Sequence, residues 1–354
     1  MPRAVQPALS RALQRAGSVA AAYLAKVIPG DVLTERGFDR AVLSLFRSVR
    51  ALLGPVDYAA VSQLVRLVED VSRVDEALAR SAVDEIARSV FGIRREYGPS
   101  LVKLLRTEGE TVAAAAKRAN SRKYKFNLDA SLSQSDSRVV DAIAESTANF
   151  IRDAAGRRLT AASATARDIV SRGVADGFDR RAILKMLREE LPIEAQHRSD
   201  AYYRMAADVY AQRARSFGTL LSLEDARVGV YEWSAVIDEP TCNVCRFMDG
   251  RRFYVAAALR TFRETAELSD PEDVRFSQPW LSERRDPETG RPTIGFTSRS
   301  GERVVVADVL ESAAGVADAR GTFAVRMSER DMQGFGISAP PIHGHCRCVI
   351  VAVV

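Results

Sequence analysis

Cysteine and histidine are scarce in this sequence, with four cysteines and three histidines among 354 residues. All four cysteines stand in two tight pairs: Cys242 and Cys245 form a C-x-x-C motif, and Cys346 and Cys348 form a C-x-C motif. No cysteine is left for bonds elsewhere, so a disulfide framework spread over the whole fold is excluded. No secretory signal is evident, and an oxidising compartment is therefore not indicated.

Long apolar runs and nucleotide-binding loops are also missing. The longest apolar stretch near the N-terminus, residues 19–28, is too short to span a bilayer and contains Lys26. A glycine-rich Walker loop is absent, so ATP-driven packaging is not encoded here. The net charge of +5 permits contact with nucleic acid without requiring it. We expect a protein that is made in a cytoplasm and does not enter a membrane.

Proline is sparse in the first two thirds of the chain, where residues 1 to about 225 hold six of the 13 prolines. This stretch is rich in Ala, Leu, Arg, Val and Glu, which predicts a mainly helical region. Helices are expected over 41–53, ended by Gly54-Pro55, over 137–172, over 180–191, ended by Pro192, and over 199–221. A possible break between two further helices is predicted at 72–75.

The clearest interruption of the helical pattern lies at residues 118–136. Its first ten residues are basic and polar, and a serine-rich segment follows. This composition predicts a loop or hinge, and a boundary between helical parts. The cations, together with Tyr124 and Phe126, could contact nucleic acid. The simpler interpretation is a solvated linker.

The pattern changes after residue 228, where alternating and β-branched segments begin. Strands are expected over 230–236, 252–255 and 349–354, a hairpin over 293–296 and 303–306, a helix over 262–268, and a polar loop over 280–291. The predicted fold class is therefore α+β. A large helical N-terminal region is followed by a smaller α+β domain that is pinned by a Cys/His metal site.

The two cysteine pairs predict one tetrahedral metal site. Zn²⁺ takes four ligands from cysteine thiolates and histidine nitrogens, a C-x-x-C turn aims both sulfurs at one point, and residues i and i+2 of a strand share a face. The predicted ligands are Cys242, Cys245, Cys346 and Cys348, and the close alternative is a Cys₃His set in which His343 replaces one sulfur of the C-x-C pair. Thiols without metal, and one or two disulfides, are the other interpretations.

An ordered series of motifs runs through the second half of the chain. It comprises Gly-Val-Ala-Asp-Gly-Phe at 173–178, helices at 180–191 and 202–218, Trp233 to Cys242 with Cys245 and Asp249-Gly250, and Pro341-Ile342-His343-Gly344-His345-Cys346-Arg347-Cys348. The order W…D…C-x-x-C…D-G…H-x-x-C-R-C resembles the phage head morphogenesis family, that of the phage Mu F-like minor head proteins. The resemblance covers about 170 to 354.

The resemblance implies a low-copy structural protein of a tailed-phage-like particle. Such a protein would reside in the virion, at the portal vertex or the capsid interior, and would serve head assembly or DNA delivery. The implied partners are the portal protein, the major capsid protein and packaged DNA. Residues 171–354 would form the family domain, and residues 1–170 a helical region that contacts portal or capsid.

An enzyme is the less favoured interpretation. Asp238, Asp249 and His343 around a zinc ion could form a hydrolytic site, but four thiolates close such a site, whereas catalytic zinc keeps an open position. Asp238 is expected to cap the turn before the C-x-x-C pair, and Asp249 to belong to a plain turn. The alternative function is that of a zinc-stabilised nucleic-acid-binding or nuclease-like protein.

Overall fold

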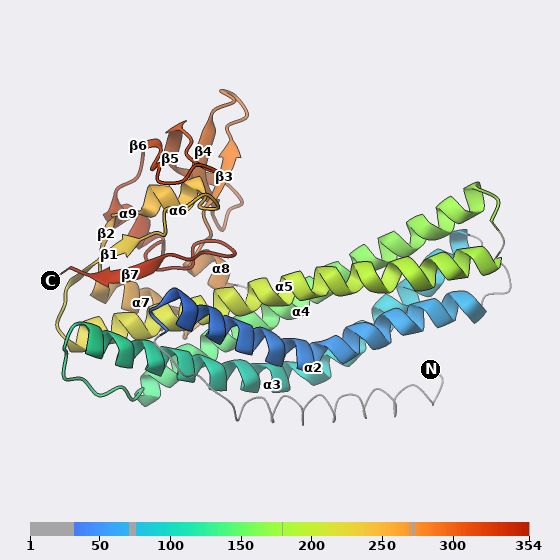
Figure 1. Ribbon diagram of the computed structural model, residues 1–354, viewed down its shortest axis with the longest axis horizontal. Helices are drawn as coiled ribbons and strands as arrows, with labels where there is room; N and C mark the ends of the chain where they lie inside the picture. Colours follow the sequence, from blue (N-terminus) through green and yellow to red (C-terminus); the bar gives the residue numbers. More distant parts are fainter. Residues whose placement is uncertain (1–31, 71–75, 179, 269, 271–272, 354) are drawn as a thin grey trace. The chain divides into compact units, whose positions relative to one another are not determined.

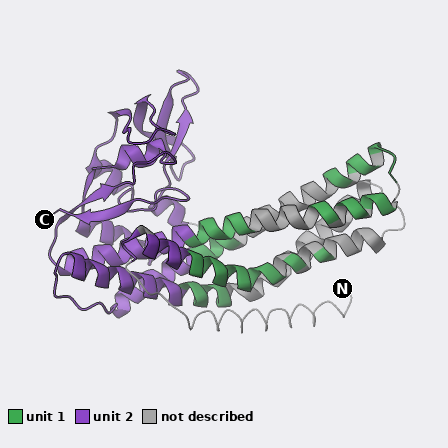
Figure 2. Cartoon of the chain, viewed as in Figure 1, with its two compact units in different colours: residues 1–27, 43–105, 147–207 green, residues 28–42, 106–146, 208–354 purple. Residues whose placement is uncertain are grey.

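The computed structural model describes residues 32–70, 76–178, 180–268, 270 and 273–353. The apolar stretch at 19–28 and the break predicted at 72–75 lie outside these residues. The chain divides into two compact units that interleave along the sequence (Figure 2). Among the described residues, unit 1 comprises those within 43–105 and 147–207, and unit 2 comprises those within 32–42, 106–146 and 208–353. Residue 170 lies inside a helix of unit 1.

Four long helices make up the first two thirds of the described chain (Figure 1). They are α2 (Glu35–Asp70), α3 (Glu76–Lys123), α4 (Gln134–Ala175) and α5 (Arg180–Asp225). The α4 prediction over 137–172 is confirmed, because Val139, Ile143 and Ile151 recur at helical spacing and are buried. None of the described helices is long and apolar enough to cross a membrane.

The predicted helix ends at the two prolines are wrong. Helix α2 continues through Pro55, and α5 runs without interruption past residue 192. A proline inside a helix removes one hydrogen bond and costs about 3 kcal/mol. Packing of a long helix can offset that cost, because most helical stability in proteins comes from tertiary contacts. The loop predicted from residue 118 is likewise shorter, since α3 ends at Lys123 and α4 begins at Gln134.

A three-stranded antiparallel sheet in unit 2 joins residues that are far apart in sequence. Its order is β2-β1-β7, with β1 at Val230–Ser234, β2 at Arg252–Tyr254 and β7 at Val349–Ala352. The pairing places Trp233 opposite Ile350, and the Trp233 side chain is fully buried, as expected for a core residue. The sheet therefore brings the segment before β7 close to the segment after β1, which are the two segments that carry the cysteine pairs.

A second antiparallel sheet has the order β3-β4-β5-β6. Its strands are β3 (Ser282–Arg285), β4 (Pro292–Thr297), β5 (Arg303–Glu311) and β6 (Thr322–Val325). The predicted hairpin is confirmed as β4 and β5. The polar loop predicted over 280–291 instead contains β3, an edge strand with mostly exposed side chains. Its polar sequence has no alternating apolar pattern, and pairing with β4 supplies its hydrogen bonds.

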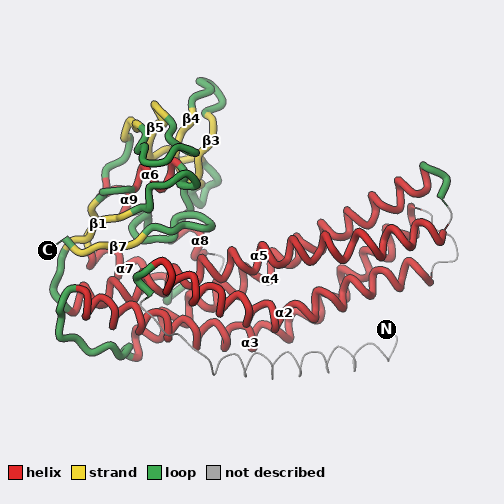
Figure 3. The backbone as a smooth tube through the Cα atoms, in the orientation of Figure 1, coloured by secondary structure: helices red, strands yellow, loops and turns green. Residues whose placement is uncertain are grey.

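Short helices complete unit 2. They are α6 (Asn243–Met248), α7 (Val255–Thr265), α8 (Val274–Ser277) and α9 (Glu329–Gly334). Figure 3 shows these helices among long loops that connect the strands of the two sheets. Phe262 of α7 packs against Phe217 of α5, with ring centroids 5.4 Å apart. The described chain is thus a helical region followed by a smaller α+β region, which confirms the predicted fold class.

Candidate metal centre

The C-x-x-C pair lies at the start of a helix rather than in an isolated turn. Cys242 is the extended residue before α6, with φ −76° and ψ 163°, and Cys245 lies within the helix. The loop before it is held by Thr241, whose hydroxyl is 2.5 Å from the carbonyl oxygen of Val236 and 2.5 Å from the Asp238 carboxylate. Both sulfurs are therefore carried by backbone of defined conformation.

The C-x-C pair precedes β7 and is not part of a strand, so the expected strand geometry for these two residues is wrong. Polar side chains of α5 hold this segment instead. Gln212 Nε2 donates to the Cys348 carbonyl at 2.5 Å, and Arg215 donates to the same oxygen at 3.3 Å. Both side chains are buried, so this backbone oxygen is satisfied inside the protein.

The five predicted ligands converge in space. The ligand atoms of Cys242, Cys245 and His343 lie within 4.8 Å of one another, and so do the sulfurs of Cys245, Cys346 and Cys348. His343 Nε2 is 2.9 Å from the Cys245 sulfur and 3.3 Å from the Cys242 sulfur. No disulfide joins the four thiols. Cys245 belongs to both groups and is therefore the centre of the cluster.

The orientation of His343 suits a metal ligand. Its Nδ1 lies 2.6 Å from the carbonyl oxygen of Gly344, which can only accept a hydrogen bond, so Nδ1 carries the proton. Nε2 then faces the sulfurs. Histidines that bind metals generally donate their other ring N–H to a carbonyl or carboxylate in this way. The donor set of thiolates and one imidazole therefore fits a metal ion.

The charges of the cluster also favour a cation. The hydrogen bond with Cys245 lowers the pKa of the Cys242 thiol to about 4, in spite of burial. Burial opposes a charge on His343, yet its hydrogen bond to Cys242 and the neighbouring thiolates raise the imidazole pKa to about 9. A proton held on His343 thus offsets the thiolate charge. A metal ion that bound Nε2 would displace this proton and take over the neutralising role.

Two buried polar side chains next to the cysteines brace the site, and the sequence prediction missed both. Arg246, which is 3% exposed, donates to the carbonyl oxygens of Thr241 at 3.0 Å, Asp238 at 2.6 Å, Val316 at 2.8 Å and also Ala319. Asn243 donates to Glu283 at 3.0 Å and to Ser312 at 2.8 Å. The only available signal was a polar residue directly after each cysteine of the C-x-x-C pair. Their burial follows from long-range contacts.

The two acidic residues near the site, Asp238 and Asp249, form ion pairs and hydrogen bonds with the surrounding loops. Asp238 pairs with Arg347 at 2.5 Å, so the arginine between the two C-x-C cysteines has an acidic partner. Asp249 accepts from the Ala235 N–H at 3.0 Å and pairs with Arg320 at 3.0 Å. Within the described residues, neither carboxylate belongs to the groups that could hold a metal.

His345 is also outside the cluster. Its side chain is 64% exposed, and Nδ1 lies 3.5 Å from an oxygen of Asp208. Burial raises the pKa of the Asp208 carboxyl to about 6, while the neighbouring His345 opposes that shift. Of the two histidines just before the C-x-C pair, His343 is therefore the one that faces the sulfurs.

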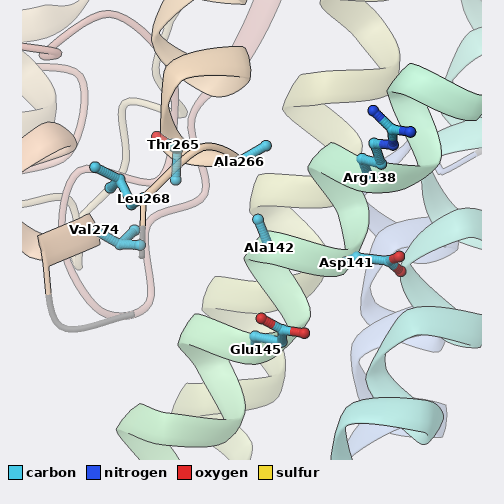
Figure 4. Close-up of a pocket in the computed structure, with 8 residues that line it drawn as sticks. All are labelled: Arg138, Asp141, Ala142, Glu145, Thr265, Ala266, Leu268 and Val274. Carbon is cyan, nitrogen blue, oxygen red and sulfur yellow. The ribbon is translucent and has the colours of Figure 1, made fainter. Parts of the chain in front are cut away.

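A separate cavity of about 200 Å³ lies between α4 and the segment from α7 to α8 (Figure 4). It is lined by Arg138, Asp141, Ala142, Glu145, Thr265, Ala266, Leu268 and Val274. Asp141 is already paired with Arg106. The lining contains no histidine, cysteine or lysine, and none of the cluster residues borders it. The metal centre is therefore the stronger candidate site.

Comparison of the chain with protein-family models, with curated proteins and with solved structures finds no significant match to any of them.

Proposed function

We propose that the cluster binds one structural Zn²⁺ ion through Cys242, Cys245, His343 and one thiolate of the C-x-C pair, with Cys346 as the preferred fourth ligand. Sulfur and imidazole donors select zinc among abundant divalent ions. Cys346 is the preferred thiolate because its charge interacts with that of His343, the histidine of the cluster. Four protein ligands leave no open position, which supports a structural rather than a catalytic role.

The ligand set predicts different outcomes for the two residues of the C-x-C pair. Cys348→Ser should retain one metal ion per chain, whereas Cys346→Ser and His343→Ala should each bind the metal at least about tenfold more weakly, because each loses a ligand. Elemental analysis gives the stoichiometry, and the visible spectrum of the Co²⁺-substituted protein reports the number of thiolates. A wild-type spectrum of four thiolates, unchanged in His343→Ala, would instead assign the site to the four cysteines.

We further propose that the protein is a low-copy minor head protein of a tailed-phage-like particle. The observation that carries this proposal is that the two motif segments resembling the phage Mu F-like family, 233–250 and 341–348, meet at one cluster of cysteines and a histidine, next to the paired strands β1 and β7. A closed site at this junction supports a structural function. The proposed location is the portal vertex or capsid interior, and the proposed partners are the portal protein, the major capsid protein and packaged DNA.

Purification of particles from producing cells tests this function. The full-length protein should co-purify with portal and major capsid proteins at a low, fixed copy number. Absence of the full-length protein from purified particles would refute the proposal. Metal-dependent cleavage of DNA by the isolated protein would favour the nuclease-like alternative.

A further inference from the structure

The C-terminal ends of α3 and α5 lie together at one end of unit 2 (Figure 1). Lys117 of α3 pairs with Asp225 of α5 at 2.7 Å, and Asn120 of α3 donates to Thr219 of α5 at 3.1 Å. Tyr124, just after α3, accepts a hydrogen bond from the N–H of Ala352 at 3.1 Å. The two helix ends and the adjoining loops therefore form one continuous surface, here called the cationic end.

The cationic end carries positive charges without acidic partners. Its exposed cations are Arg118, Arg122, Lys123, Lys125 and Arg227. Among the described residues, none of these five side chains forms an ion pair. Two of the neighbouring acids are paired with other cations, Asp225 with Lys117 and Glu224 with Arg263 at 2.7 Å. Asp129, which is hydrogen-bonded to the hydroxyl of Ser131 at 2.5 Å, is one carboxylate against the five cations. The surface thus has an uncompensated excess of positive charge.

Two of these cations occupy positions that usually belong to glycine. Lys125 and Arg227 have φ of 56° and 58°, in the left-handed region. Each follows the last turn of its helix, and the next residue donates back across that turn: Phe126 N–H to Ser121 O and Val228 N–H to Leu223 O, both at 2.8 Å. This is the helix-ending arrangement in which glycine is favoured. The chain bears backbone strain at both ends and places a cation there.

We propose that the cationic end binds the phosphate backbone of a nucleic acid. Charge complementarity favours a polyanion, and the cations lie beside aromatic rings, with Lys123 Nζ 5.1 Å from the centre of the Tyr124 ring and Tyr124 stacked on Phe126 at 5.5 Å. Cations that alternate with aromatic rings are typical of surfaces that bind single-stranded nucleic acid. Binding to the backbone of a duplex depends on the cations alone. The inference rests on the proposed function only in naming packaged DNA as the natural polymer.

The unusual backbone allows a test that separates binding from folding. In a Lys125→Gly, Arg227→Gly double variant, the charges are lost but the new residue suits the left-handed conformation. The melting temperature should stay equal or rise. Binding of a labelled 30-base-pair duplex, followed by fluorescence anisotropy between 50 and 200 mM NaCl, should weaken by about tenfold or more. The slope of log K against log salt should become shallower by about 1.8, or 0.9 for each lost phosphate contact.

The matched control removes two charges elsewhere in unit 2. Arg291→Gln with Arg330→Gln changes exposed residues of the sheet region and should alter duplex affinity less than about twofold. Equal losses in the two double variants would overturn the assignment to the cationic end, as would unchanged affinity in the glycine variant. A lower melting temperature of the glycine variant with unchanged DNA binding would show that the cations only stabilise the helix ends.

A competition experiment distinguishes a nucleic acid from an acidic protein as the ligand of the cationic end. Unlabelled duplex should displace the labelled duplex at a lower charge concentration than poly-glutamate does. Equal displacement by poly-glutamate would overturn the nucleic-acid assignment in favour of an acidic protein surface. The assay uses the isolated full-length protein, so a failure here leaves the particle test of the proposed function untouched.

Discussion

Replacement of Cys245 by serine should abolish metal binding and unfold the sheet-bearing part of unit 2. Cys245 is the cysteine shared by both ligand groups, and it is 5% exposed. Structural zinc sites contribute about 10 to 16 kcal/mol in small metal-binding peptides, which is comparable with the net stability of about 5 to 15 kcal/mol of a whole domain. Loss of the ion should therefore exceed what the apolar core of the sheets can offset.

Limited proteolysis with elemental analysis measures this outcome. New cleavage should appear within residues 230–353, while the far-ultraviolet circular dichroism of the long helices is largely retained. Cys348→Ser provides the matched control, since it makes the same chemical change at a thiol of the same cluster that the proposed ligand set does not require. Retention of metal and of protease resistance in Cys245→Ser would show that the cluster does not hold unit 2 together.

Replacement of Gly218 by alanine should strongly destabilise the helical part of unit 2. Helix α5 approaches α3 so closely at this point that an added β-carbon would overlap the carbonyl oxygen of Ala113 and lie 2.7 Å from its carbonyl carbon. These are backbone atoms, so relief requires a shift of a whole helix. Overpacking of this kind costs about 1 to 3 kcal/mol or more, although alanine is by itself the better helix former by about 1 kcal/mol.

The midpoints of thermal and urea unfolding should both be lower in this variant, because the protein is less stable. Its metal content should be unchanged. Gly334→Ala is the control: this glycine ends α9, and no atom lies within 4 Å of an added β-carbon. The control should be neutral or slightly stabilised. A Gly218→Ala protein as stable as the control would mean that α3 and α5 are further apart than described.

Several elements could be predicted from the sequence because their signals are local. The strands at 230–234 and 349–352 and the hairpin of β4 and β5 have alternating or β-branched residues, and α4 has a clear apolar stripe. The extent of α2 and α5 could not be predicted in this way. The stop signals at Pro55 and residue 192 are worth only a few kcal/mol, and contacts distributed along a long helix outweigh them.

The residues of the candidate site were predictable by type and spacing, but their support was not. With only four cysteines in the chain, two tight pairs and an adjacent histidine predict one metal centre from residue type and spacing. Arg246 lies between Cys245 and Phe247, and arginine is a residue type that is mostly exposed. Its four carbonyl partners come from two loops, and only the folded chain brings these loops to one side chain.

The sequence by itself therefore determined the chemistry of this protein: which atoms can bind a metal, where most of the helices and several strands lie, and where cations accumulate. These properties depend on residue identity and on neighbours a few positions away. Tertiary structure decided which of these groups meet. The pairing of β1 with β7 joins the cysteine pairs, α5 carries Gln212 and Arg215 to the C-x-C backbone, and α3 ends beside α5. Such contacts depend on packing between segments that are about one hundred residues or more apart in the sequence, and no local pattern encodes them.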